Sequence, residues 1–139
     1  MFLSKQTRTR NFEFTHDSFS DVTPTWSKVL NSYKNKENLN YLEIGMFEGR
    51  SMIWMFDNIL TAGSCRATGI DVFYEAPRER IENNLKLAGI REKVNIIQGN
   101  SRIVMKTMDP EQFDIIYVDA DHRARGALAD LVLAWDLLK

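Results

Sequence analysis

The chain has 139 residues, a formal net charge of -1, 44% hydrophobic residues and 27% charged residues. This length suits one domain with a buried core. The balanced charge argues against a nucleic-acid-binding protein, which would usually carry a strongly basic face. No apolar run approaches the roughly 18 residues that cross a bilayer. The N-terminal sequence lacks the apolar segment and cleavage site of a secretion signal, so we expect a cytoplasmic protein that binds neither nucleic acid nor membrane. One cysteine and two histidines exclude a disulfide scaffold and a zinc framework.

Residues 1–22 are polar, with basic side chains set among single aromatic ones, and they are predicted to form an N-terminal arm. Residues 23–139 contain no internal repeat and no linker rich in proline or glycine, so we expect a single domain there. We expect the arm to be solvated, although His16 and Asp17 could instead fold over a binding site.

The rest of the chain alternates between helix and strand patterns. A first helix is expected to begin at Thr23, whose hydroxyl can cap it, because Pro24 then fixes the backbone angle where no amide donor is needed. Four strands and four further helices follow from the spacing of the apolar residues. The predicted strands span residues 41–44, 67–72, 94–98 and 113–118, and the predicted helices span residues 51–60, 78–88, 102–108 and 125–138.

The predicted strands are mostly apolar instead of alternating in polarity, which indicates a parallel sheet with helices on both faces. We therefore predict a Rossmann-like, doubly wound α/β fold. Its last helix carries an apolar face made of Leu128, Leu131, Val132 and Trp135. Ligands of such sheets bind at the carboxyl ends of the strands, so the functional residues are sought there.

The first strand leads into a turn with two glycines. Gly45 permits a sharp turn, and Gly49 lets the backbone approach a ligand at the start of the next helix. With Ser51, this turn could receive a carboxylate or a phosphate. Phe47 stands where the dinucleotide fingerprint has its middle glycine, which counts against NAD. A plain turn with two packing glycines is the other reading of the same residues.

Polar residues also follow the second and third strands. Asp71 lies about 20 residues beyond the glycine turn, where an acid can accept hydrogen bonds from ribose hydroxyls. The alternative is a solvated or helix-capping aspartate. For Asp71 alone that alternative would be preferred, but the preceding glycine turn favours the ribose contact. After the third strand, Asn100 and Ser101 could bind an adenine edge, and Ser101 could equally be a simple helix cap.

Three titratable side chains follow the fourth strand. Asp119 could bind a hard divalent cation or orient an acceptor, and His122 could take a proton near neutral pH. In the alternative reading, Asp121 caps the next helix and His122 is a surface residue. We select Asp119 and His122 as the candidate catalytic residues.

Four motifs in chain order carry a resemblance to a known family. They are Glu43-x-Gly45-x-x-x-Gly49, Gly69-Ile70-Asp71, Gly99-Asn100-Ser101 and the run from Phe113 to His122. Their order and spacing resemble those of class I S-adenosylmethionine-dependent methyltransferases. The resemblance covers about residues 39–139 and is greatest for the small-molecule O-methyltransferase-like branch, of the methyltransferase domain 24 type.

The resemblance implies a site for S-adenosylmethionine, with the methionine part near Glu43, Gly45 and Ser51 and the ribose held by Asp71. Asp119 matches the residue that binds a divalent cation such as Mg²⁺ in metal-dependent members, where the metal lowers the pKa of the acceptor hydroxyl. The acceptor would be a small molecule or a sugar. The implied cofactor-binding residues are Glu43, Gly45, Phe47, Gly49, Ser51, Asp71, Val72, Asn100, Ser101 and Asp119.

The chain also departs from that family at its end. It stops at Lys139 inside an apolar helical pattern without a capping residue, so we expect a fragment that lacks the final strands. The expected strand order is 3-2-1-4, which leaves the fourth strand as an exposed edge through which copies could form a homo-oligomer. Two alternative functions stay open, a non-catalytic S-adenosylmethionine-binding module and a nicotinamide-dependent oxidoreductase domain.

Overall fold

A computed structural model describes residues 10–139 of the chain, so residues 1–9 of the expected arm lie outside the described residues. At its centre is a four-stranded parallel sheet in the order β3-β2-β1-β4. Both the Rossmann-like fold and the strand order predicted from the sequence are therefore confirmed. The strands are β1 (Asn40–Ile44), β2 (Arg66–Asp71), β3 (Val94–Gln98) and β4 (Ile115–Val118).

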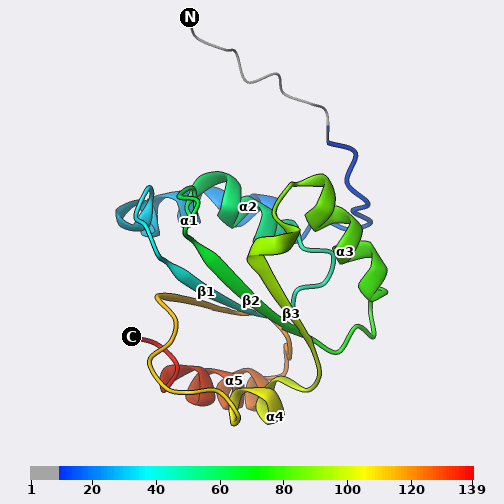
Figure 1. Ribbon diagram of the computed structural model, residues 1–139. Helices are drawn as coiled ribbons and strands as arrows, with labels where there is room; N and C mark the ends of the chain where they lie inside the picture. Colours follow the sequence, from blue (N-terminus) through cyan, green and yellow to red (C-terminus); the bar gives the residue numbers. More distant parts are fainter. Residues whose placement is uncertain (1–9) are drawn as a thin grey trace, which may run out of the picture.

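The helices lie in two layers on opposite faces of the sheet (Figure 1). One layer contains α1 (Thr23–Val29), α2 (Arg50–Asn58) and α3 (Arg78–Leu87), and the other contains α4 (Ser101–Met105) and α5 (Ala124–Trp135). Three short 3-10 turns complete the fold, η1 (Ser20–Val22), η2 (Asn31–Tyr33) and η3 (Arg91–Lys93).

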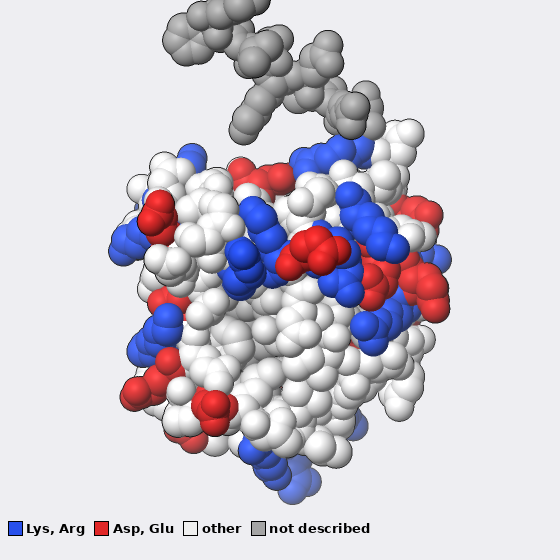
Figure 2. Space-filling view, in the orientation of Figure 1, with Lys and Arg blue, Asp and Glu red and all other residues white. Residues whose placement is uncertain are grey.

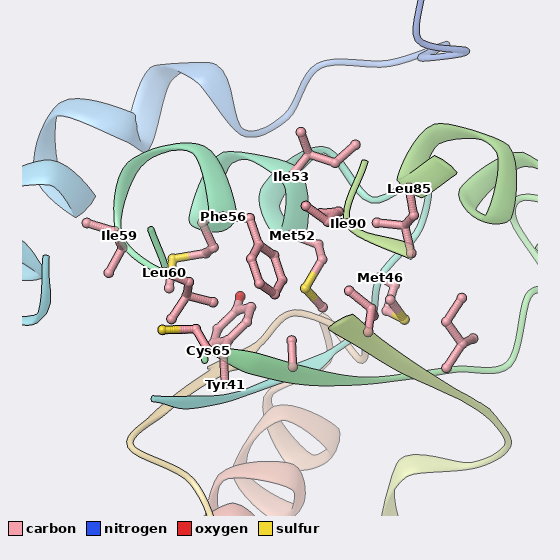
Figure 3. Close-up of a cluster of buried hydrophobic side chains, with 14 of the residues drawn as sticks. Tyr41, Met46, Met52, Ile53, Phe56, Ile59, Leu60, Cys65, Leu85 and Ile90 are labelled. Atoms are coloured by element: carbon pink, nitrogen blue, oxygen red, sulfur yellow. The ribbon is translucent and has the colours of Figure 1, made fainter. Parts of the chain in front are cut away.

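Strand β1 contributes to a core on each face of the sheet. Tyr41 packs in the cluster beneath α2, whereas Leu42 belongs to the cluster on the α4–α5 side. Figure 3 shows Met52 and Phe56 of α2 pointing toward the sheet, where the Tyr41 ring lies. Since successive side chains of a strand point to opposite faces, the apolar character of β1 follows from its burial on both sides.

The described part of the arm is fastened to the domain through its aromatic side chains, although most of its residues are exposed. Phe19 is buried, and its ring meets the rings of Trp26 and Trp54 edge-on. Helix α1 does begin at Thr23, but Thr23 is not its cap. The turn η1 leads directly into the helix, and the Thr23 hydroxyl donates to the carbonyl of Ser20 at 2.8 Å.

The end of the chain differs from the predicted helix over residues 125–138, since α5 ends at Trp135. Leu138 forms a parallel bridge with Phe113, and the amide of Lys139 donates to the carbonyl of Phe113. The residues of β4 are half-buried, so this edge of the sheet is less open than the sequence led us to expect.

No helix within residues 10–139 is both long and apolar enough to span a bilayer. On the face of the molecule shown in Figure 2, basic and acidic side chains lie next to one another in the upper part and along the edges, and the middle of the view is mostly uncharged. The described residues of this face therefore mix both signs of charge.

Candidate functional site

A cleft of about 790 Å³ opens at the carboxyl ends of the strands. Its volume lies in the usual range for small-molecule sites, about 300 to 1,000 Å³. Residues predicted from all four strand ends meet there, as expected for a parallel sheet. The predicted site residues that line it are Gly45, Phe47, Asp71, Val72, Asn100, Ser101, Asp119 and His122.

Three predicted residues lie elsewhere. Ser51 lines a smaller cavity of about 40 Å³ that shares Gly45 with the main cleft. Gly49 precedes α2 with a φ of 82°, and Glu43 is fully buried. Neither Gly49 nor Glu43 lines either cavity, so these two residues can affect the site only through their neighbours.

Gly45 brings the ends of β1 and β4 together. Its φ is +89°, a conformation that side chains rarely adopt, and an added Cβ would lie 2.2 Å from the carbonyl oxygen of Asp119. Both reasons require glycine at this position. The turn after β1 is therefore in direct contact with the backbone of the candidate catalytic aspartate.

Asp71 has a structural role in addition to its predicted ribose contact. Its Oδ2 accepts hydrogen bonds from the amides of Met46 and Phe47 at 2.8 and 2.9 Å, and its Oδ1 accepts from the amide of Phe73 at 2.7 Å. A carboxylate offers about four acceptor positions. The three amides leave one of them for a ligand hydroxyl.

At the end of β3, the helix cap is Asn100 and not Ser101. The side chain of Asn100 accepts from the amide of Arg102 at 3.0 Å. Ser101 donates its hydroxyl to Oδ1 of the buried Asp130 at 2.9 Å. Both residues line the cleft as predicted, and Ser101 links α4 to α5.

Asp119 is held by a residue that the sequence analysis missed. Its Oδ2 accepts from the Tyr117 hydroxyl at 2.9 Å, and His122 Nδ1 lies 3.8 Å from its Oδ1. Burial first, and then the charge of Asp119, raise the pKa of Tyr117, so the phenol stays a hydrogen-bond donor. Strand periodicity could have identified Tyr117, because residues two apart share a face.

Asp121 forms ion pairs with two arginines, and we assign it no role in the chemistry of the site. Its carboxylate accepts from Nη2 of Arg102 and from Nη2 of Arg123, each at 2.9 Å. The side-chain hydrogen bond from Arg123 is the main cause that lowers the pKa of Asp121. The carboxylate also accepts from the Arg123 amide at 3.1 Å, but the residue at the cap position of α5 is Arg123 and no side chain caps this helix, so the helix-capping reading of Asp121 is wrong.

Glu43 joins β1 to α2 inside the protein. Its Oε2 accepts from the Tyr41 hydroxyl at 2.8 Å, and its Oε1 accepts from the Ser51 hydroxyl at 2.5 Å. Burial raises the pKa of Glu43 to about 8, against the opposing effect of these two hydrogen bonds. Glu43 therefore fixes Ser51 at the start of α2.

Two residues of the arm also belong to the site. His16 and Ser18 line both cavities. The sequence indicated His16 as a residue that could fold over a site, but nothing in the pattern pointed to Ser18. Across residues 10–139, no three His, Cys, Asp or Glu side chains gather closely enough to hold a metal ion.

Comparison with known proteins agrees with this architecture. A family model described as a methyltransferase domain matches residues 42–139. No curated protein matches the chain in sequence.

Several solved structures share the fold. An O-methyltransferase from Bacillus cereus, solved with S-adenosylhomocysteine (SAH), is 25% identical with a TM-score of 0.63, covering 91% of this chain and 55% of its own. The O-methyltransferase TomG from Streptomyces achromogenes, solved with S-adenosylmethionine, is 23% identical with a TM-score of 0.60, covering 79% and 50%. A SAM-dependent O-methyltransferase from Thermotoga maritima is 17% identical with a TM-score of 0.70, covering 93% and 44%. The chain spans about half the length of the solved structures it matches.

Proposed function

The chain belongs to the methyltransferase domain family, and we propose that it binds S-adenosylmethionine and transfers the methyl group to a hydroxyl of a small molecule or a sugar. The observation that carries this proposal is the contact between Gly45 and the backbone of Asp119. It places the turn proposed to bind the cofactor beside the acid proposed to orient the acceptor.

The cleft suits an adenosyl ligand in size and in chemistry. It offers Asp71 for ribose hydroxyls and Asn100 with Ser101 for the adenine edge, and Ser51 lies at the other end beside Gly45. The glycine turn allows close approach of the backbone to a ligand. These groups are the ones that the family resemblance assigns to the cofactor.

When bound, S-adenosylmethionine supplies a methyl group on a cationic sulfur, which an acceptor oxygen can displace in line. The protein then contributes mainly by positioning. Tyr117 orients the carboxylate of Asp119 through Oδ2, and Oδ1 is directed toward His122. Asp119 can accept a hydrogen bond from the acceptor hydroxyl, and His122 can receive its proton.

A divalent cation would need more ligands than the described residues supply, since Asp119 is not joined by two further candidate ligands. We therefore derive no step through a metal ion. A cytoplasmic location and association of copies through the β4 edge stay predictions.

Calorimetric titration with SAH and with NAD tests the cofactor. We expect micromolar binding of SAH and no binding of NAD. Asp71→Asn should weaken SAH binding by about 1 kcal/mol or more, whereas Asp109→Asn, at an exposed position, should leave it unchanged. Binding of NAD in place of SAH would support the oxidoreductase reading, and binding of neither by the folded chain would contradict the proposal.

A further inference from the structure

Residues 13–18 of the arm cross the edge of the cleft, and we call this segment the strap. His16 and Ser18 line both the main cleft and the smaller cavity. The smaller cavity is lined by these two residues together with Gly45 and Ser51. The strap thus forms a wall at the end of the site where the methionine part of the cofactor is proposed to lie.

A buried carboxylate fastens the strap. Glu48 is 1% exposed, and its Oε2 accepts from the amide of Thr15 at 2.8 Å. Its Oε1 accepts from the Thr15 hydroxyl at 2.7 Å and from Nη1 of Arg80 at 2.8 Å. Because a buried carboxylate without its partners is costly, release of the strap would leave Glu48 with Arg80 alone.

A buried amide fastens the strap at a second point. Asn84 of α3 is completely buried, and its Oδ1 accepts from the amide of Glu13 at 2.8 Å. Its Nδ2 donates to the carbonyl of Glu48 at 2.9 Å and to that of Glu13 at 3.4 Å. Asn84 is absent from the residues that line the two cavities, so the proposed chemistry gives it no direct role.

Arg50 holds the middle of the strap. Its guanidinium lies 4.2 Å from the centre of the Phe14 ring, and its Nη1 lies 3.5 Å from Oδ2 of Asp17. Since Arg50 also lines the smaller cavity, the same side chain contacts the strap and the site.

We propose that the strap closes the amino-acid end of the cofactor site, and that Asn84 is a positioning residue that acts on the ligand through it, while Glu48 fastens the strap and itself lines the smaller cavity. This inference rests on the proposed function. It requires that loosening the strap weakens the binding of a ligand that has an amino-acid end and leaves the binding of a ligand without this end unchanged.

Two ligands separate these cases in calorimetric titrations. SAH carries the amino-acid end, and 5′-methylthioadenosine retains the adenine, the ribose and the sulfur without it. Asn84→Ala should weaken SAH binding about tenfold and leave methylthioadenosine binding unchanged. The matched control is Asn83→Ala, which lies at an exposed position of the same helix and should affect neither ligand.

A milder variant and a double-mutant cycle separate positioning from stability. Thr15 is exposed, and Thr15→Val removes one donor to Glu48, so it should weaken SAH binding in the same selective way but by a smaller factor. If Asn84 acts through the strap, the losses of SAH binding free energy caused by His16→Ala and by Asn84→Ala should not be additive in the double variant. Additive losses, or equal weakening of both ligands, would overturn the strap inference while the cofactor assignment stands. Failure of both ligands to bind the unmodified chain would overturn the proposed function, and this inference with it.

Discussion

The two faces of the sheet are built in different ways. Among residues 10–139, sixteen buried hydrophobic residues form one cluster on the face covered by α1, α2 and α3, whereas the cluster on the face covered by α4 and α5 has seven. Helix α5 buries Gly126, Asp130 and Ala134. The side chains of the predicted apolar face, Leu128, Leu131, Val132 and Trp135, are exposed instead, from 54% for Leu131 to 76% for Trp135, whereas Leu133 packs against the core of this face.

Small and charged residues hold the second face together. A Cβ on Gly126 would lie 1.9 Å from Oδ2 of Asp121 and 2.7 Å from Nη2 of Arg102. Nη2 of Arg102 donates to Asp121 at 2.9 Å, and its Nε lies 3.4 Å from Oδ1 of Asp130. The comparison teaches that an apolar stripe does not by itself decide which side of a helix faces the sheet. Helix α5 turns its small residues inward, because only they allow it to lie this close to its neighbours.

The largest expected effect compares one leucine from each face. Leu85 of α3 is fully buried, whereas Leu131 of α5 is half exposed. Leu85→Ala should reduce the free energy of unfolding by about 3 kcal/mol, and Leu131→Ala by less than about 1 kcal/mol. Urea denaturation of both variants measures the difference. Equal losses would mean that the exposed face of α5 is covered in solution.

The second prediction concerns buried charge, which also differs between the faces. Asp130 lies near the guanidinium of Arg102, but the hydrogen-bond partners of Glu43 are the hydroxyls of Tyr41 and Ser51. Because the pKa of Glu43 is raised from 4.5 to about 8, the folded chain holds a proton that the unfolded chain releases between these pH values. This contribution to stability is fully present below pH 4.5 and is lost as the pH rises through 8.

Glu43→Gln isolates this effect, since glutamine has no proton to lose. From pH 6.5 to pH 8.5, the wild type should lose on the order of 2 kcal/mol of unfolding free energy relative to the variant. Denaturation at a series of pH values measures the difference between the two proteins. A difference that stays constant with pH would show that Glu43 keeps an ordinary pKa in the folded state.

The smallest expected effect tests the close approach at α5. Gly126→Ala gains helix propensity, but the new Cβ must displace the Asp121–Arg102 pair, so we expect a net loss of about 1 kcal/mol. Gly63→Ala is the matched control, because nothing lies within 4 Å of a Cβ there. In thermal denaturation, the melting temperature of Gly126→Ala should lie below that of the control variant. The reverse order would mean that the ion pair moves aside at no cost.

The sequence was most informative where a local pattern is sufficient. The apolar strands and the polar residues that follow them predicted a parallel sheet with one site at its carboxyl edge, and the structure brings Gly45, Asp71, Asn100 and Asp119 to one cleft. The roles of these residues stay predictions. Tyr117 was missed although strand periodicity places it on the same face as Asp119, so that signal was present but not used.

By itself, the sequence determined the order of the elements, the fold class and the set of strand ends that meet, because these follow from periodicity and from the rules for parallel sheets. Only the tertiary structure decided three things. It packed the arm into the site, it made Asn100 the cap of α4, and it turned the apolar face of Leu128, Leu131, Val132 and Trp135 outward. The cap is a local hydrogen bond between Asn100 and the amide of Arg102, but the other two depend on contacts between residues far apart in the chain, such as Thr15 with Glu48 or Gly126 with Arg102. The spacing of residues within one segment carries no record of such contacts.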